Sequence, residues 1–553
     1  MKIGLVGINM YVRAMNYACP LHVYAFQKYL QDKGFDVTVV DYLPNTNKFE
    51  TGYDARHPSV YFSNKVQAQE AELERLTKAG ADAEKISALK AKIKKNAESR
   101  DSFLAIYDER AQRHDKQWEF IDQYIVKTEQ QYNCALMEVG DPGFDCYICV
   151  TDIIWDKFPT GYEPGFFLAL KCMENKWKIS YSASKLVAPT EKDVELTTSW
   201  IRDMDFVSVR ENFMQKQIQD TIRPDVACVL DPVLLHDGAV YEDILVKPQE
   251  EKFLLLYYVV ENNPEIILNA LAYAKKHGLK IIELSDKTSQ NKLTRDSDVE
   301  VIYKYGAGIQ EWLGYFRHAD CVFTNSFHGC CLSILFEKNF FVGRRNNYDK
   351  ISALLESVDL MGRITDDRPF DQIPDVIDSW DVVREKLDKR RKESEYFIMN
   401  ALTVAQQQPH PVKDYLEAKK NQVFNMWYNI GKKKKSINDN VLPQYRAKTK
   451  SLFVRKNSVE YLQGKIKNDG STALHANVFQ VENMRFVGWR IRVHVDYHKF
   501  YLLEDGSFRA VDAYWADQEP EVACRVFAPG EPIPVIDLNR IQSCVAEGVW
   551  EAE

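Results

Sequence analysis

The strongest constraint on the fold is an alternation of short apolar runs with helical patterns, which begins at the first residues. The run KIGLVGI (2–8) has the composition of a buried parallel strand. Helical spacing of apolar residues follows over PLHVYAFQKYLQDKG (20–34), and DVTVVDYLP (36–44) supplies a second strand that ends at Pro44. A strand, a helix and a second strand of this length form a βαβ unit, so the sequence predicts an α/β fold.

The same alternation resumes in two later series. The first contains FDCYICV (144–150), KISYSAS (178–184) and FVSVR (206–210), and it closes near residue 240. The second begins at KFLLLYYVV (252–260) and continues through three further strand-like runs, LKIIELS, DCVFTN and NFFVG. We expect two Rossmann-like domains, 1–240 and 241–408, that face each other across a cleft at the carboxyl ends of their strands.

Three other segments differ in composition from these domains. Residues 64–128 are rich in Glu, Lys, Ala and Gln, which predicts a charged helical insertion. Residues 409–450 have the character of a helical and basic linker, and 451–553 alternate as strands do, which predicts a small, mostly β domain. The aromatic side chains of that domain could stack on sugar rings, although such residues are more often core.

Composition excludes several classes of protein. The formal charge of −8 argues against a protein that neutralises a nucleic-acid backbone, so no nucleic-acid partner is expected. No apolar run reaches membrane-spanning length, and we expect a cytoplasmic protein, with peripheral contact at the inner membrane face through Lys432, Lys433, Lys434 and Lys435. The 11 cysteines show no repeated spacing, and Cys146 and Cys149 would point to opposite faces of a strand, so no metal site is expected.

The stretch FTNSFHGCCLSILF (323–336) joins a strand to a helix through a polar turn. Ser326 and His328 therefore lie where the first backbone N–H groups of a helix favour an anion. Histidine adds a group that can transfer a proton near neutral pH, although a histidine at such a junction is often structural. Arg210 and Glu211 form a similar junction in the first domain, where the alternative to an anion site is a simple charge pair. Arg210 and His328 could meet across the cleft on one small anion.

Several of these segments together resemble the polysaccharide pyruvyl transferase family. The likeness covers about residues 1–365 without much of the helical insertion, and its most specific part is Ser-Phe-His-Gly at 326–329 in series with Ser-Val-Arg-Glu at 208–211. The resemblance implies a fold like that of the two-domain B-type glycosyltransferases. It also implies transfer of pyruvate from phosphoenolpyruvate to a sugar diol as a cyclic ketal, with release of phosphate and without a further cofactor.

The resemblance assigns roles to particular residues. His328 and Arg210 match positions linked in the family to the binding and activation of phosphoenolpyruvate, and His328 suits a general acid and Arg210 an anion clamp. The acceptor would be a cell-surface glycan or its lipid-linked oligosaccharide precursor. Further residues expected to contact substrate are Ser326, Gly329, Asn325, Asn16, Ser182, Ser184, Asp152, Arg344 and Arg345.

The chain departs from the family pattern at three places. Val150-Thr151-Asp152-Ile153 keeps only the acid of the usual Gly-Ser-Asp-Gln, and Asn325 replaces an aspartate near His328. Ala18 replaces the usual glycine after Asn16-Tyr17. Loss of a carboxylate close to His328 should lower its pKa and weaken acid catalysis. Two alternatives therefore stay open: a nucleotide-sugar glycosyltransferase on the same fold, and a catalytically silent glycan-binding or scaffold protein.

Overall fold

The computed structural model describes thirteen stretches of the chain, which form two compact units. The stretches are 1–7, 15–44, 53–158, 161–184, 191–259, 264–343, 348–365, 370–430, 453–456, 459–479, 483–496, 498–511 and 523–553. The first unit comprises Met1–Gln131, Phe144–Leu168 and Trp177–Pro409. The second comprises Tyr132–Gly143, Ala169–Lys176 and His410–Glu553, so it takes in two segments from within the first 240 residues as well as the C-terminal region.

The first unit contains a six-stranded parallel sheet in the order β2-β1-β3-β4-β5-β6. Its strands are almost entirely buried and read as apolar runs because helices cover both faces of a parallel sheet. The bounds are β1 Lys2–Gly7, β2 Asp36–Val39, β3 Cys146–Asp152, β4 Trp177–Ala183, β5 Phe206–Val209 and β6 Val226–Cys228, with helices α1 Ala18–Asp32, α6 Glu191–Asp203, α7 Asn212–Thr221 and α8 Ala239–Glu242.

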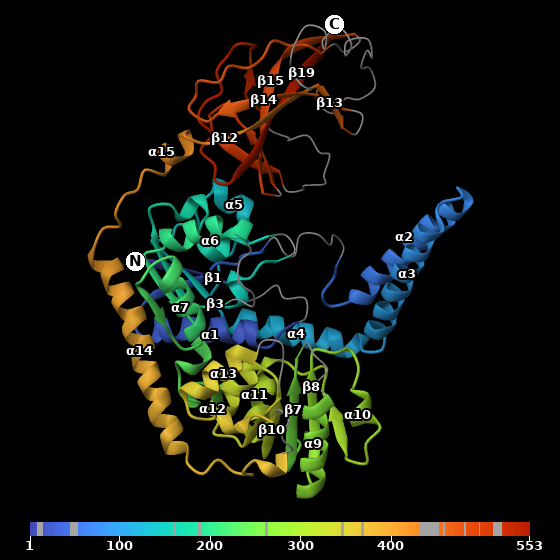
Figure 1. The fold of residues 1–553 in the computed structure, drawn as a ribbon, viewed down its shortest axis with the longest axis vertical. Helices are drawn as coiled ribbons and strands as arrows, with labels where there is room; N and C mark the ends of the chain where they lie inside the picture. Colours follow the sequence, from blue (N-terminus) through green and yellow to red (C-terminus); the bar gives the residue numbers. More distant parts are fainter. Residues whose placement is uncertain are drawn as a thin grey trace. The chain divides into compact units, whose positions relative to one another are not determined.

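A second parallel sheet of five strands, in the order β11-β10-β7-β8-β9, belongs to the same unit. Its strands are β7 Phe253–Tyr258, β8 Lys280–Ser285, β9 Val301–Tyr303, β10 Cys321–Thr324 and β11 Phe340–Val342. Its helices are α9 Pro264–His277, α10 Lys292–Arg295, α11 Ile309–His318, α12 Phe327–Leu335 and α13 Tyr348–Ser357, and the 28-residue α14 Trp380–Gln407 follows them (Figure 1).

Alternation along β7 shows how the two sheets are held together. Leu254 and Leu256 face the side covered by α9, whereas Leu255 and Tyr257 face a core that also contains α11, α12 and the interior of the first sheet. One hydrophobic core therefore runs from Ile3 of β1 to these strands. Burial of this shared core joins the two sheets into one compact unit.

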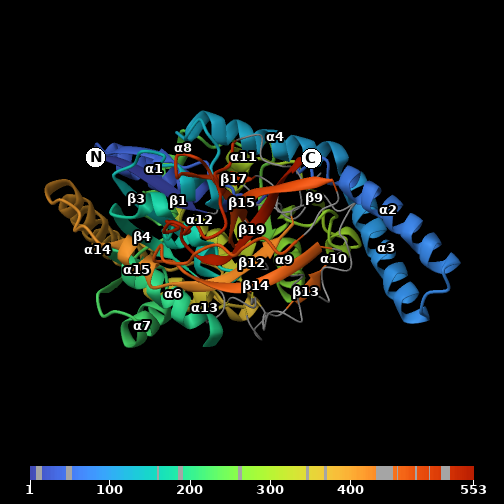
Figure 2. The ribbon, with the colours of Figure 1, turned by 90° about the horizontal axis from the view of Figure 1, so that it is seen from above.

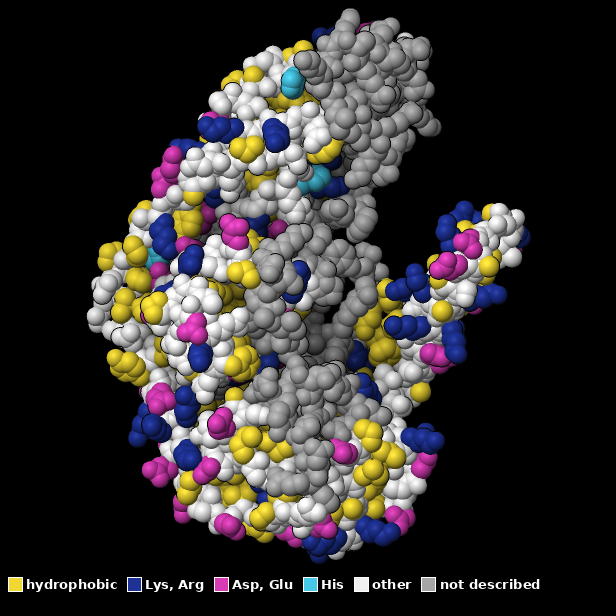
Figure 3. All heavy atoms as spheres, in the orientation of Figure 1, with side chains coloured by type: hydrophobic (Ala, Val, Ile, Leu, Met, Phe, Trp, Pro, Cys, Tyr) yellow, Lys and Arg dark blue, Asp and Glu magenta, His cyan; other side chains and the backbone are white. Residues whose placement is uncertain are grey.

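The helical insertion consists of α2 Pro58–Lys78, α3 Ala83–Leu104 and α4 Tyr107–Tyr124. The views in Figures 1 and 2 agree that α2 and α3 lie side by side as an arm, and α3 has no buried residue. Lys, Arg, Asp and Glu side chains are mixed along this arm in Figure 3, as expected for a solvated surface. The described helices include none that is long and apolar enough to cross a membrane.

The second unit is a mixed, mostly antiparallel sheet in the order β13-β14-β12-β19-β15-β16-β17, with β18 paired to β15. Its elements are α5 Cys134–Val139, α15 Tyr415–Lys420, β12 Val423–Asn429, β13 Phe453–Lys456, β14 Val459–Lys467, β15 Met484–Val495, β16 His498–Leu502, β17 Phe508–Val511, β18 Val526–Phe527 and β19 Ile541–Ala552. Trp489, Phe500 and Tyr501 are buried within the unit, so these aromatic rings pack inside it. The expected fold class, α/β with parallel sheets and a separate, mostly β C-terminal domain, is confirmed.

Candidate active site

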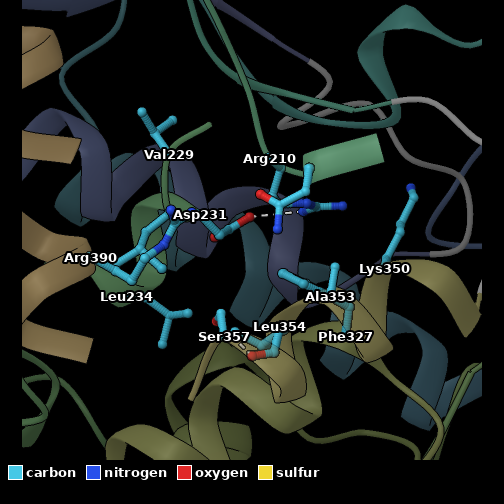
Figure 4. Close-up of a pocket in the computed structure, with 12 residues that line it drawn as sticks. Arg210, Val229, Asp231, Leu234, Phe327, Lys350, Ala353, Leu354, Ser357 and Arg390 are labelled. Carbon is cyan, nitrogen blue, oxygen red and sulfur yellow. Dashed lines mark hydrogen bonds and ion pairs between the residues drawn. The ribbon is translucent and has the colours of Figure 1, made fainter. Parts of the chain in front are cut away.

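A small pocket in the first unit lies where the ends of both parallel sheets meet (Figure 4). Arg210 follows β5, Asp231 follows β6, and Phe327 and Lys350 come from the first turns of α12 and α13. The pocket also contains Asn212, Val229, Leu230, Leu234, Ala353, Leu354, Ser357 and Arg390. The pocket is therefore lined by charged residues that follow strands of the first sheet and by residues at the N-termini of helices that pack on the second sheet.

Arg210 is surrounded by three carboxylates although only 7% of the residue is exposed. Its Nε donates to Glu211 Oε1 at 3.0 Å, its Nη1 to Asp231 Oδ2 at 2.9 Å and its Nη2 to Asp152 Oδ1 at 3.3 Å. Burial opposes the charge, but the three carboxylates hold the pKa of Arg210 above its usual value. The guanidinium lies over the Phe327 ring, 4.1 Å from its centroid.

Asp231 connects Arg210 with His328. Its Oδ1 accepts from the backbone N–H of Val233 at 3.1 Å, which fixes the carboxylate at the start of a 3-10 turn, Pro232–Leu234. Its Oδ2 accepts from Arg210 and lies 3.5 Å from His328 Nε2, longer than an ordinary hydrogen bond. Burial would raise the pKa of Asp231, but His328 and Arg210 hold it well below its usual range, so this group is an anion.

A second histidine, His22 of α1, lies beside His328. The two ring centroids are 5.8 Å apart, and His22 is 0% exposed. Neither ring nitrogen of His22 has a hydrogen-bond partner among the described residues. Burial lowers the pKa of His22 to about 4, despite the attraction of Asp231, so its imidazole is neutral at neutral pH.

The backbone around Arg210 is strained. Thr151, Asp152 and Ser182, which are not glycines, have φ values of 42°, 64° and 56°. Such conformations cost of order 1–3 kcal/mol each and occur where the surrounding structure enforces them, often at functional sites. Thr151 Oγ1 donates to the Ser182 carbonyl at 2.9 Å, and this contact holds the two strand ends together.

The structure places several of the candidate residues named from the sequence in one polar network. Asp152 bonds to Arg210, and Ser184 Oγ donates to Glu211 Oε1 at 2.8 Å, next to the Arg210 contact on the same oxygen. Ser182 joins the same network through Thr151. The candidate residues of the first sheet therefore form one polar cluster.

Residues of the strand–helix junction have structural contacts. Ser326 is the N-cap of α12 and accepts from the Gly329 N–H at 3.3 Å. Asn325 accepts from Val259 N at 2.9 Å and donates to Val259 O at 3.3 Å, a pairing that an aspartate could not complete. The carboxylate that faces His328 is thus Asp231, not position 325.

The remaining candidates lie elsewhere. Asn16 Oδ1 accepts from Ala18 N at 2.8 Å at the start of α1. Arg344, Arg345 and Lys432, Lys433, Lys434 and Lys435 fall outside the described residues. Cys146 and Cys149 are buried in β3, and no group of three metal-binding side chains exists in the part of the chain that the structure describes.

Sequence reasoning missed three residues of the site. The only sign in the sequence that Asp231 belongs to the site is its place before a proline at the end of a strand-like run. His22 looks like one more residue of an apolar helix. Lys350 follows the second sheet and lines the pocket, 6% exposed. Burial, with the nearby charge of Arg210, lowers the pKa of Lys350 to about 8.

Comparison with known protein families identifies the chain. The family model described as "Polysaccharide pyruvyl transferase" matches residues 21–343, which include every charged residue of the Arg210 cluster together with His22 and His328. The chain belongs to the polysaccharide pyruvyl transferase family. Lys350 lies beyond the segment that matches the polysaccharide pyruvyl transferase family model.

This member of the polysaccharide pyruvyl transferase family shares little sequence with the individual proteins it resembles. No curated protein matches it. Among solved structures, UDP-GlcNAc 2-epimerase from Neisseria meningitidis, bound to UDP-GlcNAc, aligns at 10% identity over 74% of this chain and 95% of its own, with a TM-score of 0.32. The glycosyltransferase SnogD from Streptomyces nogalater aligns at 10% identity over 74% of this chain and 99% of its own, with a TM-score of 0.33.

Proposed function

We propose that this protein transfers pyruvate from phosphoenolpyruvate to two hydroxyl groups of one sugar in a glycan, as a cyclic ketal. The observation that carries the proposal is the arrangement of Arg210, Asp231 and His328, in which one carboxylate oxygen connects a buried cation with an imidazole. This arrangement sets an imidazole against a charged cluster that lines the pocket through Arg210 and Asp231. Membership of the family supports the transfer of a pyruvyl group.

The reaction balances without an oxidant, a reductant or a metal. The methylene carbon of the enolpyruvyl group takes a proton and becomes a methyl group, which leaves a cationic centre at the neighbouring carbon. Two sugar oxygens bond to that carbon, and its bond to the phosphate oxygen breaks. Of the two hydroxyl protons, one replaces the proton given to the methyl group, so the acid is restored after each turnover, and the other leaves with hydrogen phosphate.

His328 is the proposed general acid. The Asp231 carboxylate, which is an anion, lies 3.5 Å from Nε2 of the ring. Neutral His22 beside it adds no competing positive charge. Together these neighbours suit a histidine that must hold a proton and then release it to carbon.

Arg210 is the proposed organiser of the donor site. Three of its five N–H groups bind carboxylates, which leaves two for a substrate anion at the pocket wall. The N-terminus of α12 adds the free backbone N–H groups of its first turn, with Ser326 holding the cap. We propose a cell-surface glycan or lipid-linked oligosaccharide as the acceptor.

Phosphate release tests the proposal. Purified protein is incubated with phosphoenolpyruvate and a panel of glycans in deuterium oxide, and the products are examined by NMR. We expect phosphate release that depends on one glycan and a ketal methyl group with one solvent deuterium. His328→Gln should remove both signals, whereas His277→Gln, at a half-exposed ring of α9, should leave them unchanged.

Two results would favour other functions. Transfer of a sugar from a nucleotide sugar to the same panel, with no phosphoenolpyruvate consumption, would identify a glycosyltransferase. Glycan binding that is unaffected by His328→Gln, with no turnover of either donor, would identify a binding or scaffold protein.

A further inference from the structure

Lys350 differs from the other buried lysines of the described chain in having no ion-pair partner among the residues that the structure describes. Lys178 lies 2.5 Å from Asp203, and Lys419 lies 2.8 Å from both Glu174 and Asp537. Lys350 is 6% exposed, and no carboxylate among the described residues lies within ion-pair distance of its Nζ. A buried ammonium without a partner costs several kcal/mol unless an anion binds it.

The position of Lys350 indicates where that anion would lie. Lys350 is the third residue of α13 and lines the same pocket as Arg210 and Phe327. Figure 4 shows its side chain rising from α13 among the residues that line the pocket. The N-terminal end of α13 carries the positive end of the helix dipole.

The charges that face Lys350 are Arg210, Asp152, Glu211 and Asp156. Asp152 and Glu211 already accept from Arg210, and Arg210 repels a second cation. The pKa of about 8 follows from burial first and from Arg210 second. Lys350 therefore carries charge at neutral pH that no carboxylate of the described residues neutralises by contact.

We propose that Lys350 binds the phosphoryl group of the donor, an inference that rests on the proposed function for the identity of that donor. A lysine ammonium is a compact charge with three rotatable donors, which suits a tetrahedral phosphate, whereas three of the five N–H groups of Arg210 already bind carboxylates. An ammonium at the departing phosphate also stabilises the charge that develops when the bond to carbon breaks.

Binding of a phosphoryl dianion should depend on pH in a defined direction. The anion favours the charged form of Lys350, so the affinity is greatest when the ammonium is present. Affinity should fall as pH rises through about 8, where the free protein loses that proton. Arginine stays charged over this range, so Lys350→Arg should retain binding at pH 9 relative to pH 7.

Calorimetric titration with inorganic phosphate, pyruvate and phosphoenolpyruvate tests the assignment. We expect Lys350→Gln to lower the affinity for phosphate and for phosphoenolpyruvate roughly 10- to 100-fold at pH 7, and the affinity for pyruvate much less. The matched control is Lys386→Gln, which removes a half-exposed lysine of α14 whose Nζ lies 3.2 Å from Asp359, and it should bind like the wild type. The structural integrity of each variant is checked by its thermal transition.

The outcomes separate this inference from the proposed function. Phosphate binding that depends on Lys350, without any consumption of phosphoenolpyruvate, would support the inference and contradict the function. If the Lys350→Gln variant formed the ketal at the wild-type rate and bound phosphoenolpyruvate with the wild-type affinity, the inference about Lys350 would be overturned and the proposed function would stand. A greater loss for pyruvate than for phosphate would place the carboxylate at Lys350 and overturn the phosphoryl assignment, and absence of phosphate binding by the wild type would overturn it as well.

Discussion

The Nε2 atom of His328 lies 3.5 Å from Oδ2 of Asp231. The two residues come from different sheets of the first unit, since Asp231 follows β6 and His328 belongs to the first turn of α12. The same oxygen accepts from Arg210. Formation of the site therefore depends on the packing of the two sheets. The charged carboxylate of Asp231 lies next to both the Arg210 guanidinium and the His328 ring.

Asp231→Asn should lower catalysis more than donor binding. The substitution keeps the shape but removes the negative charge 3.5 Å from Nε2 of His328, the proposed general acid, so we expect kcat to fall by roughly 10²- to 10⁴-fold. The affinity for phosphoenolpyruvate should change much less. Asp41→Asn, which removes a buried carboxylate paired with Lys127 at 3.1 Å, is the control, and an equal loss of kcat in both variants would contradict the role of Asp231.

Arg210→Met should destabilise the fold. It leaves buried Glu211 and Asp231 and partly buried Asp152 without their shared cation, and we expect the free energy of unfolding to fall by about 3–5 kcal/mol. Urea denaturation measures the change. Arg75→Met, at the exposed pair with Glu72 on α2, should have no measurable effect, and similar behaviour of the two variants would show that the cluster is unimportant for stability.

His22 should make the protein sensitive to acid. Below pH 6.5 the unfolded chain takes up a proton at this position, whereas the folded protein resists protonation until about pH 4. The contribution of neutral His22 to the free energy of unfolding is therefore fully present above pH 6.5. About 3 kcal/mol of it is lost as pH falls from 6.5 to about 4. His22→Gln should show a smaller fall in the free energy of unfolding between pH 7 and 4 than the wild type and His277→Gln. Parallel pH profiles for all three proteins would contradict this account.

Gly329→Ala should disrupt the turn that carries His328. An added Cβ would lie 2.3 Å from Thr324 Oγ1, so the end of β10 or the start of α12 must move. We expect a loss of about 1–3 kcal/mol in stability together with reduced activity. Gly362→Ala, where the new Cβ meets nothing within 4 Å, should be silent, and equal stability of both variants would show that the turn can adjust without cost.

Much of the architecture could be predicted from local patterns. The apolar runs 144–150 and 252–260 correspond to β3 and β7, because strands buried on both faces need apolar residues at every position. The junctions at Arg210 and His328 follow from strand ends that precede helices. The two segments that join the second unit, Tyr132–Gly143 and Ala169–Lys176, carry no such signal, because their placement depends on tertiary packing.

The site could be predicted only in part, for a physical reason. Strand periodicity places Arg210 and Ser184 at one sheet edge, but it cannot show that Glu211 turns inward to accept from both. An unpartnered histidine such as His22 looks like any polar residue on a buried helix until its neighbours are known. Charge balance around a cation is a property of the folded chain. The three carboxylates at Arg210, and the lack of an ion-pair partner for Lys350 among the described residues, therefore appear only in the structure.

Calorimetric titration of the wild-type protein with phosphoenolpyruvate, beside UDP-GlcNAc and the His328→Gln variant, tests the central claim most directly. The account predicts that phosphoenolpyruvate binds the wild type, that His328→Gln retains this binding but forms no ketal, and that UDP-GlcNAc does not bind. Binding of UDP-GlcNAc in the absence of any phosphoenolpyruvate binding would contradict it.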